Sequence, residues 1–198
     1  MIHILQKESP VLRKKAEAVP VAEIGSAKMR RVLKNMQAAL ESQDDGVALA
    51  APQIGVSLRV FIVSKAALFP SPRGVAEGRK LSQPPKATPF ATGDDRAELK
   101  RAAGYMVFIN PVITKLSRDK AILDEGCLSV RPLYGKIKRS KKAVVKAHDE
   151  HGKPFERGAS GLLAQIFQHE CDHLDGVLFI DKAIDVKELQ IDNANAAD

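Results

Sequence analysis

The stretch that decides the fold is Gln168-His169-Glu170-Cys171-Asp172-His173-Leu174-Asp175-Gly176. It places His169 and His173 four residues apart, and Glu170 follows the first histidine directly. Because positions i and i+4 share one face of an α-helix, both imidazoles can bind the same metal ion. Glu170 would then lie beside the ion, where a carboxylate can take a proton from water. Two ligands do not hold a catalytic metal ion, so a third ligand is needed.

The chain after His173 offers poor third ligands. A long zinc-protease motif would need a further histidine at the position of Phe179, and the only later glutamate is Glu188, close to the chain end. Cys127 is a better candidate, because a thiolate binds zinc or ferrous iron strongly. With His169 and His173, it would complete a three-ligand site with an open fourth position, typical of hydrolytic centres.

A third stretch, Gly46-Val47-Ala48-Leu49-Ala50-Ala51-Pro52-Gln53, is rich in small residues. Such residues let another backbone or a ligand approach closely. Gln53 ends the run with a side-chain amide that can donate a hydrogen bond to a developing oxyanion.

These three stretches resemble the motifs of the peptide deformylase family. The family motifs are Gly-x-Gly-Leu-Ala-Ala-x-Gln, Glu-Gly-Cys-Leu-Ser and Gln-His-Glu-x-Asp-His, and they correspond to residues 46–53, 125–129 and 168–173. The second and third motifs match fully, whereas Ala48 stands where the family usually has glycine. The resemblance covers most of the chain, except a middle segment and the C-terminal end.

The resemblance implies a metal-dependent hydrolase that removes the N-formyl group from the N-terminal formylmethionine of newly made polypeptides. It implies one divalent metal ion, natively Fe²⁺, with Zn²⁺, Ni²⁺ or Co²⁺ able to occupy the same site. Glu170 would be the acid–base residue. The Gln53 amide and the backbone N–H of Leu128 would stabilise the oxyanion.

The substrate-binding residues are expected around the metal site. Ile166 lies one helical turn before His169 and would form a wall of the methionine pocket, which Val47 would help to line. A peptide substrate would pair as a strand beside residues 46–48, from Gly46 to Ala48. The Ala48 methyl group would narrow this slot or conflict with a positive φ.

Two further residues depart from or extend the family pattern. Tyr134 stands where the family often has arginine, so we expect this wall of the substrate channel to be reshaped. By the same alignment, Arg139 pairs with Glu125 and braces the loop that carries Cys127.

Two alternatives remain open from the sequence. The first is another metallohydrolase, a peptidase or amidase, although Phe179 and the position of Glu188 argue against it. The second is a noncatalytic or altered-substrate metalloprotein of the same fold, which Ala48 and Tyr134 would permit. The presence of Glu170 argues against a purely structural metal site.

The composition bounds the class of protein. A chain of 198 residues with 44% hydrophobic residues fits one globular domain. Its net charge of +7 serves solubility or attracts an anionic surface, for which the resemblance suggests the ribosome. The densest basic run lies at residues 136–146, but no specific nucleic-acid motif accompanies it. No signal peptide or membrane span is evident, so we expect a cytoplasmic protein with free Cys127 and Cys171 rather than a disulfide.

The expected fold is α+β, with small antiparallel β-sheets surrounding a central metal-binding helix in a single domain, residues 1–198. An insertion is expected at about 66–103, with a helical piece at 94–103, and a polar tail from about 187. His148 and His151 flank a turn and are not expected to bind metal. The expected elements are a helix at Ser26–Gln43, a strand at Leu58–Val63, and a strand at Met106–Ile113 that is interrupted at Asn110-Pro111. The segment Ala121–Leu123 leads into the Cys127 motif. A hairpin of Lys141–His148 with Pro154–Glu156 follows, and then a helix at Gly161–Leu174 that is capped by Ser160 and ended by Gly176.

Overall fold

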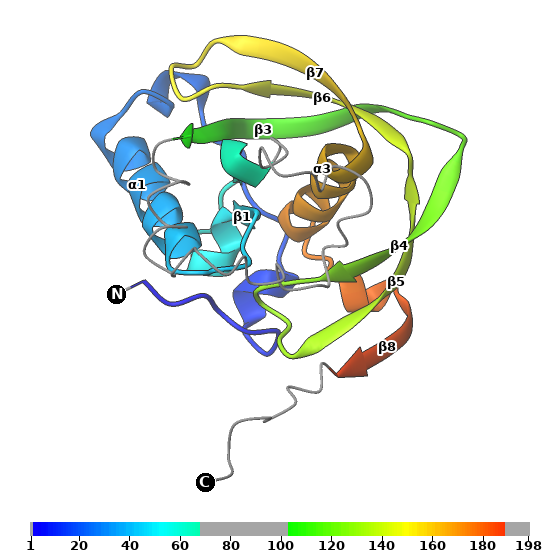
Figure 1. Cartoon of the computed structure of the whole chain (residues 1–198). Helices are drawn as coiled ribbons and strands as arrows, with labels where there is room; N and C mark the ends of the chain where they lie inside the picture. The colour runs from blue at the N-terminus through cyan, green and yellow to red at the C-terminus, as the bar shows by residue number, and fades with distance from the viewer. Residues whose placement is uncertain (1, 68–102, 189–198) are drawn as a thin grey trace, which may run out of the picture.

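The computed structural model describes residues 2–67 and 103–188. These residues form two antiparallel β-sheets and two α-helices, which confirms the α+β prediction (Figure 1). The expected insertion, its helical piece and most of the polar tail lie outside the described residues. No helix within the described ranges is long and apolar enough to cross a membrane.

A five-stranded sheet forms one wall of the molecule, in the strand order β1-β2-β3-β6-β7. Its strands are β1 (Ala48–Ala50), β2 (Val60–Ser64), β3 (Tyr105–Leu116), β6 (Lys142–His148) and β7 (Pro154–Ser160). All five residues of β2 are buried, because this strand is covered on both faces. Phe61 and Val63 face the cluster that contains α3 (Gly161–Leu174), whereas Val60 and Ile62 face the cluster that contains α1 (Ala27–Glu41).

A second sheet of three strands has the order β4-β5-β8. Its strands are β4 (Lys120–Gly126), β5 (Leu133–Ser140) and β8 (Ile184–Glu188). The segment Ala121–Leu123 lies within β4, which leads directly into Cys127. Lys187 and Glu188, at the predicted onset of the polar tail, pair with Tyr134 and Leu133 of β5.

The helix α3 lies between the two sheets, as predicted for the metal-binding helix (Figure 1). Its bounds match the prediction. Ser160, the last residue of β7, occupies the predicted N-cap position, but its hydroxyl makes no capping hydrogen bond. Gly176 follows the helix at φ +77°, and a Cβ atom there would lie 2.8 Å from the carbonyl oxygen of Arg13. Only glycine fits this close approach.

The helix α1 begins one residue after the predicted start. The Ser26 hydroxyl caps it by accepting a hydrogen bond of 3.1 Å from the backbone N–H of Met29. Its buried face carries Leu33, Met36 and Leu40, which pack against the five-stranded sheet. This helix covers the face of the sheet that is turned away from α3.

The strand β3 passes through the predicted interruption at Asn110 and Pro111. Asn110 has a φ of 51°, and the register with β6 shifts between Ile109 and Val112. The Asn110 side chain accepts a hydrogen bond of 2.8 Å from the Val19 N–H and donates one of 2.7 Å to the Val19 carbonyl. The strand bulges at this point and continues to Leu116.

Candidate metal centre

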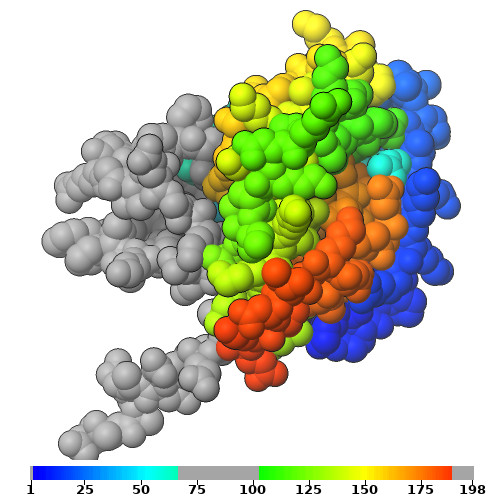
Figure 2. Space-filling view, turned by 90° about the vertical axis from the view of Figure 1, so that its right-hand side faces the viewer, coloured from blue at the N-terminus to red at the C-terminus, as the bar shows by residue number. Residues whose placement is uncertain are grey.

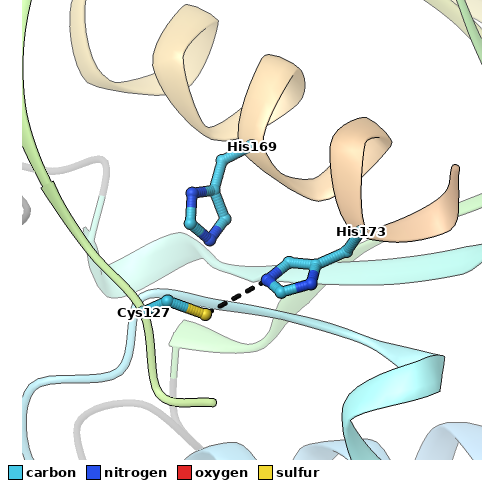
Figure 3. A group of neighbouring side chains, drawn as sticks. All are labelled: Cys127, His169 and His173. Atoms are coloured by element: carbon cyan, nitrogen blue, oxygen red, sulfur yellow. Dashed lines mark hydrogen bonds between the residues drawn. The ribbon is translucent and has the colours of Figure 1, made fainter. Parts of the chain in front are cut away.

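Cys127, His169 and His173 converge at one point in the structure (Figure 3). Each offers one ligand atom, and the three atoms lie within 4.8 Å of one another. Cys127 Sγ lies 3.1 Å from Nε2 of His173, and the centres of the two imidazole rings are 4.9 Å apart. The helix supplies the two imidazoles from successive turns, and the loop after β4 supplies the thiol. The structure thus brings together the three residues that the sequence proposes as metal ligands.

His169 is oriented by a carboxylate behind it. Its Nδ1 atom lies 2.5 Å from Oε1 of Glu125, which leaves Nε2 for a metal ion. Glu125 is fully buried, and Arg139 donates to it from Nη2 at 2.8 Å and from Nε at 3.1 Å. Burial raises the pKa of Glu125, but His169 and Arg139 outweigh burial and lower this pKa to about 2. The ion pair of Glu125 with Arg139 agrees with the sequence expectation.

The second imidazole is in a different environment. His173 is 1% exposed, and its Nδ1 atom has no hydrogen-bond partner among the described residues. Burial is the main cause that lowers the pKa of His173 well below its usual value, and the nearby His169 adds to it. A neutral imidazole keeps a lone pair for metal binding. A thiol and two imidazoles are a donor set that suits zinc or ferrous iron.

Glu170 is a buried carboxyl group on α3, directly after the ligand His169. It is 4% exposed, and its Oε2 atom has no hydrogen-bond partner in the described part of the chain. Burial raises its pKa to about 7, which a neighbouring His169 partly opposes. A carboxyl group with such a pKa can both accept and donate a proton near neutral pH.

Gln53 reaches the loop that carries Cys127. Its Oε1 accepts a hydrogen bond of 2.8 Å from the Ala50 N–H, which fixes the side-chain amide. Its Nε2 donates to Ser129 Oγ at 3.0 Å and lies 3.7 Å from Cys127 Sγ. The amide donor therefore lies at the metal site, as the sequence suggested.

The N-terminal segment contacts both loops beside the metal site, which the sequence did not suggest. The Leu5 N–H donates a hydrogen bond of 2.8 Å to the carbonyl of Gln53. The Gln6 side chain donates one of 3.1 Å to the carbonyl of Leu128. Leu128 itself is half-buried after Cys127.

Comparison with known proteins agrees with this geometry. Residues 1–189 match the sequence model of the family described as polypeptide deformylase. The chain belongs to this family. A peptide deformylase from Halothermothrix orenii is 36% identical over 191 residues, which are 96% of this chain and 99% of that protein. The chloroplastic and mitochondrial peptide deformylase 1A of Arabidopsis thaliana is 36% identical over 96% of this chain, which spans only 64% of that longer protein.

Solved structures of the deformylase family share the fold. A peptide deformylase from Legionella pneumophila superposes with a TM-score of 0.69 and 32% identity, over 93% of this chain and 88% of that one. A peptide deformylase from Synechococcus elongatus in complex with actinonin superposes with a TM-score of 0.68 and 27% identity, over 92% of this chain and 79% of that one.

The first deformylase motif forms the outer edge of the five-stranded sheet. A Cβ atom on Gly46 would lie 2.7 Å from Leu40 Cδ1 and 3.3 Å from Leu128 Cδ1, so any larger residue would have to displace the Leu40 side chain. Ala48 is extended in β1 and has no positive φ, so its methyl group does not conflict with the backbone. The Ser64 N–H donates to the Val47 carbonyl, and by the alternation of an antiparallel pair the N–H and C=O of Ala48 point away from β2.

Ile166 and Tyr134, two of the residues predicted to bind substrate, lie in different parts of the structure. Ile166 is 1% exposed and packs in the core cluster with Phe61 and Phe167. Tyr134 alternates along β5 with inward-facing Gly135, and it shares the outer face of the strand with the exposed Lys136. Tyr134 itself is half-buried and pairs with Gly126, the residue before Cys127.

The other candidate ligands stay apart from the centre. Within the described ranges, no metal-binding group besides the trio includes His148, His151 or Glu188. Both cysteines are free thiols, and Cys171 is 6% exposed. Burial is the main cause that raises the pKa of Cys171 to about 12.

Sequence reasoning gave Asp172 no role, although it is part of the third motif. In the structure it accepts a hydrogen bond of 2.6 Å from Arg139. Its place beside two ligand histidines in the motif is the signal that could have suggested a supporting role.

Proposed function

We propose that the protein is a metal-dependent hydrolase that removes the N-formyl group from the formylmethionine of newly made polypeptides. Membership of the deformylase family supports this activity. The single observation that carries it is the convergence of Cys127, His169 and His173 beside buried Glu170, a carboxyl group with an unpartnered oxygen among the described residues. This is the donor set and the acid–base group that hydrolysis of an amide needs.

Cys127, His169 and His173 would hold one divalent metal ion. When bound there, the ion would lower the pKa of water and polarise the formyl carbonyl. We propose Fe²⁺ as the native ion on the basis of the family resemblance, and the same donors accept Zn²⁺, Ni²⁺ or Co²⁺. Glu125 would keep the His169 ring in the tautomer that presents Nε2.

Glu170 would move the proton during the reaction. Its carboxylate would take a proton from the attacking water, whose oxygen forms a new bond to the formyl carbon. The same carboxyl group would then deliver the proton to the nitrogen as the C–N bond breaks, which yields formate and a free amine. The pKa of about 7 supports both roles.

Gln53 and Leu128 would stabilise the oxyanion on the formyl carbon. The Gln53 amide is already fixed through Ala50 and Ser129 and needs little reorganisation. The backbone N–H of Leu128 would be the second donor. Each donor of this kind typically contributes about 10²–10³ in rate.

The peptide would bind along β1 as an added strand. The outward N–H and C=O of Ala48 would pair with the substrate backbone. Gly46 and Val47 would line the same slot, and Ile166 would form part of the methionine pocket. Tyr134, on the outer face of β5, would at most contact residues of a longer peptide.

We also propose that the protein is cytoplasmic and that a cluster of exposed basic residues contacts the ribosome surface. The turn between β3 and β4 lies against the corner between β5 and β6, on the face that Figure 2 shows. Phosphate groups of RNA would be attracted to this cluster without a sequence-specific motif. Its exposed cations are Lys115, Arg118, Lys120, Lys138, Lys141 and Lys142.

Formate release from a formyl-methionyl peptide tests the proposal. The parent would be purified without oxygen, loaded with Fe²⁺ and compared with Glu170→Gln and with Glu150→Gln, a control in the exposed β6–β7 turn. We expect turnover by the parent and the control, and a loss of about 10²–10⁴-fold in Glu170→Gln with metal content unchanged. A parent that binds iron but releases no formate would instead favour the altered-substrate or noncatalytic alternative.

A further inference from the structure

Asp172 stands between the two ligand histidines in the sequence, and its carboxylate binds two cations. Its Oδ2 accepts a hydrogen bond of 2.6 Å from Nη1 of Arg139. Its Oδ1 accepts one of 2.7 Å from Nζ of Lys182. The Asp172 side chain is 17% exposed, and that of Arg139 is only 5% exposed. Asp172 is therefore anchored on both oxygens and partly withdrawn from water.

These contacts continue inward to a metal ligand. Arg139 binds both oxygens of Glu125, and Glu125 Oε1 lies 2.5 Å from Nδ1 of His169. Formal charges alternate along the chain from Lys182 through Asp172 and Arg139 to Glu125. Asp172 thus reaches His169 through two buried side chains, although the two residues are neighbours on one helix.

The guanidinium of Arg139 is shared between two carboxylates, and this sharing has an electrostatic consequence. With Asp172 in place, the positive charge of Arg139 is divided, and Glu125 keeps more negative charge for His169. Without Asp172, Arg139 would act on Glu125 alone, and its Nη1–H would lose this partner. Electrostatic interactions between hydrogen-bonded side chains are stronger in a buried network than in water.

We propose that Asp172 is a positioning residue that acts through Arg139 and Glu125 to orient His169 and strengthen it as a metal ligand. Lys182, which follows the 3₁₀ helix Phe179–Asp181 and lies outside all three motifs, holds Asp172 in place from the surface. The inference rests on the proposed metal centre, but not on the formyl substrate.

Metal affinity tests the inference directly. The full chain would be stripped with a chelator and titrated with Co²⁺ against a chromogenic competitor, for the parent, Asp172→Asn, Lys182→Met and Lys182→Arg. We expect Asp172→Asn to weaken Co²⁺ binding by about 10–100-fold. Lys182→Met should bind Co²⁺ up to about fivefold more weakly than the parent, and Lys182→Arg should bind it with the parent affinity. Lys187→Met is the matched control, because Lys187 makes a similar ion pair of 3.0 Å with Asp185 that ends at the surface.

A second measurement separates positioning from plain stabilisation. In the Zn²⁺-loaded protein with ¹⁵N-labelled histidine, the Nδ1 proton of His169 should resonate far downfield. It should move upfield in Asp172→Asn, because Glu125 becomes a weaker acceptor. An unchanged proton shift and an unchanged Co²⁺ affinity, with only a lower unfolding temperature, would overturn the inference. A parent that binds Co²⁺ but releases no formate would refute the proposed activity and leave this comparison valid.

Discussion

Arg139 holds Glu125 through two hydrogen bonds that run side by side, one from Nη2 and one from Nε. Both side chains are buried, and neither belongs to the metal-ligand trio. The fork of a guanidinium matches a carboxylate in this way, and a lysine could not replace it. The pair connects β5 to the end of β4, just before Cys127, and through Glu125 to Nδ1 of His169.

Replacing Arg139 should therefore destabilise the fold. Arg139→Met leaves Glu125 buried and charged without its guanidinium partner, and we expect the free energy of unfolding to fall by about 3–5 kcal/mol. Urea unfolding of the metal-free protein measures this loss. Lys141→Met is the control, because the ion pair of Lys141 with Asp119 is exposed. This substitution should lower the free energy of unfolding by no more than about 1 kcal/mol. Equal costs for the two variants would contradict the prediction.

Gln53→Glu should slow the reaction without weakening substrate binding. The glutamate keeps an oxygen for the Ala50 N–H but removes the amide donor beside Cys127. We expect kcat to fall by about 10²–10³ and KM to change little. Steady-state kinetics with matched metal content decide this, and a change confined to KM would assign Gln53 to ground-state binding instead.

Ala48→Pro tests the edge of β1. The proline removes an N–H that points away from β2, so the sheet keeps its ladder while the substrate loses a backbone partner. We expect KM for a formyl-methionyl tripeptide to rise about tenfold or more, a loss of the size of one hydrogen bond to a buried partner. Ala48→Gly keeps the N–H and serves as the comparison. If both variants raise KM equally, the outward N–H has no role in binding.

Cys171 should resist alkylation in the folded protein. Its burial and its pKa of about 12 leave almost no exposed thiolate at pH 8. In the Cys127→Ser variant, iodoacetamide labelling followed by mass spectrometry should track the urea unfolding curve. Rapid labelling before unfolding would show that the thiol is accessible.

Metal binding should stabilise the folded chain. At a free Zn²⁺ concentration of one hundred times Kd, the free energy of unfolding should rise by about 2.7 kcal/mol. Differential scanning fluorimetry with and without a chelator follows the shift. Cys127→Ser should lose most of it, and a shift that persists in this variant would place the ion elsewhere.

The local sequence predicted the helices well, because their signals lie within the elements themselves. The bounds of α3 follow from its apolar spacing and from Gly176. The strand β3 was predicted too short, since Asn110 and Pro111 look like a break, whereas Asn110 binds Val19 far away in the chain. β8 was not predicted, because its residues are all exposed and show no apolar alternation.

The candidate site also contains residues that the local sequence predicts and residues that only the tertiary structure shows. The ligands and Glu170 stand in short motifs, and their residue types carry the chemistry. The contacts of Asp172 with Arg139 and Lys182 depend on how β5 and the chain after α3 pack, which no local pattern encodes. The placement of Tyr134 also depends on the strand register, because a shift of one residue would turn it inward.

The hydrogen bonds of Leu5 and Gln6 tie the start of the described chain to the two loops that carry the proposed oxyanion donors. The spacing of the two proposed oxyanion donors would thus depend on Leu5 and Gln6, which belong to none of the three motifs. Changes at Leu5 or Gln6 would therefore act on turnover, although neither side chain is proposed to touch the substrate.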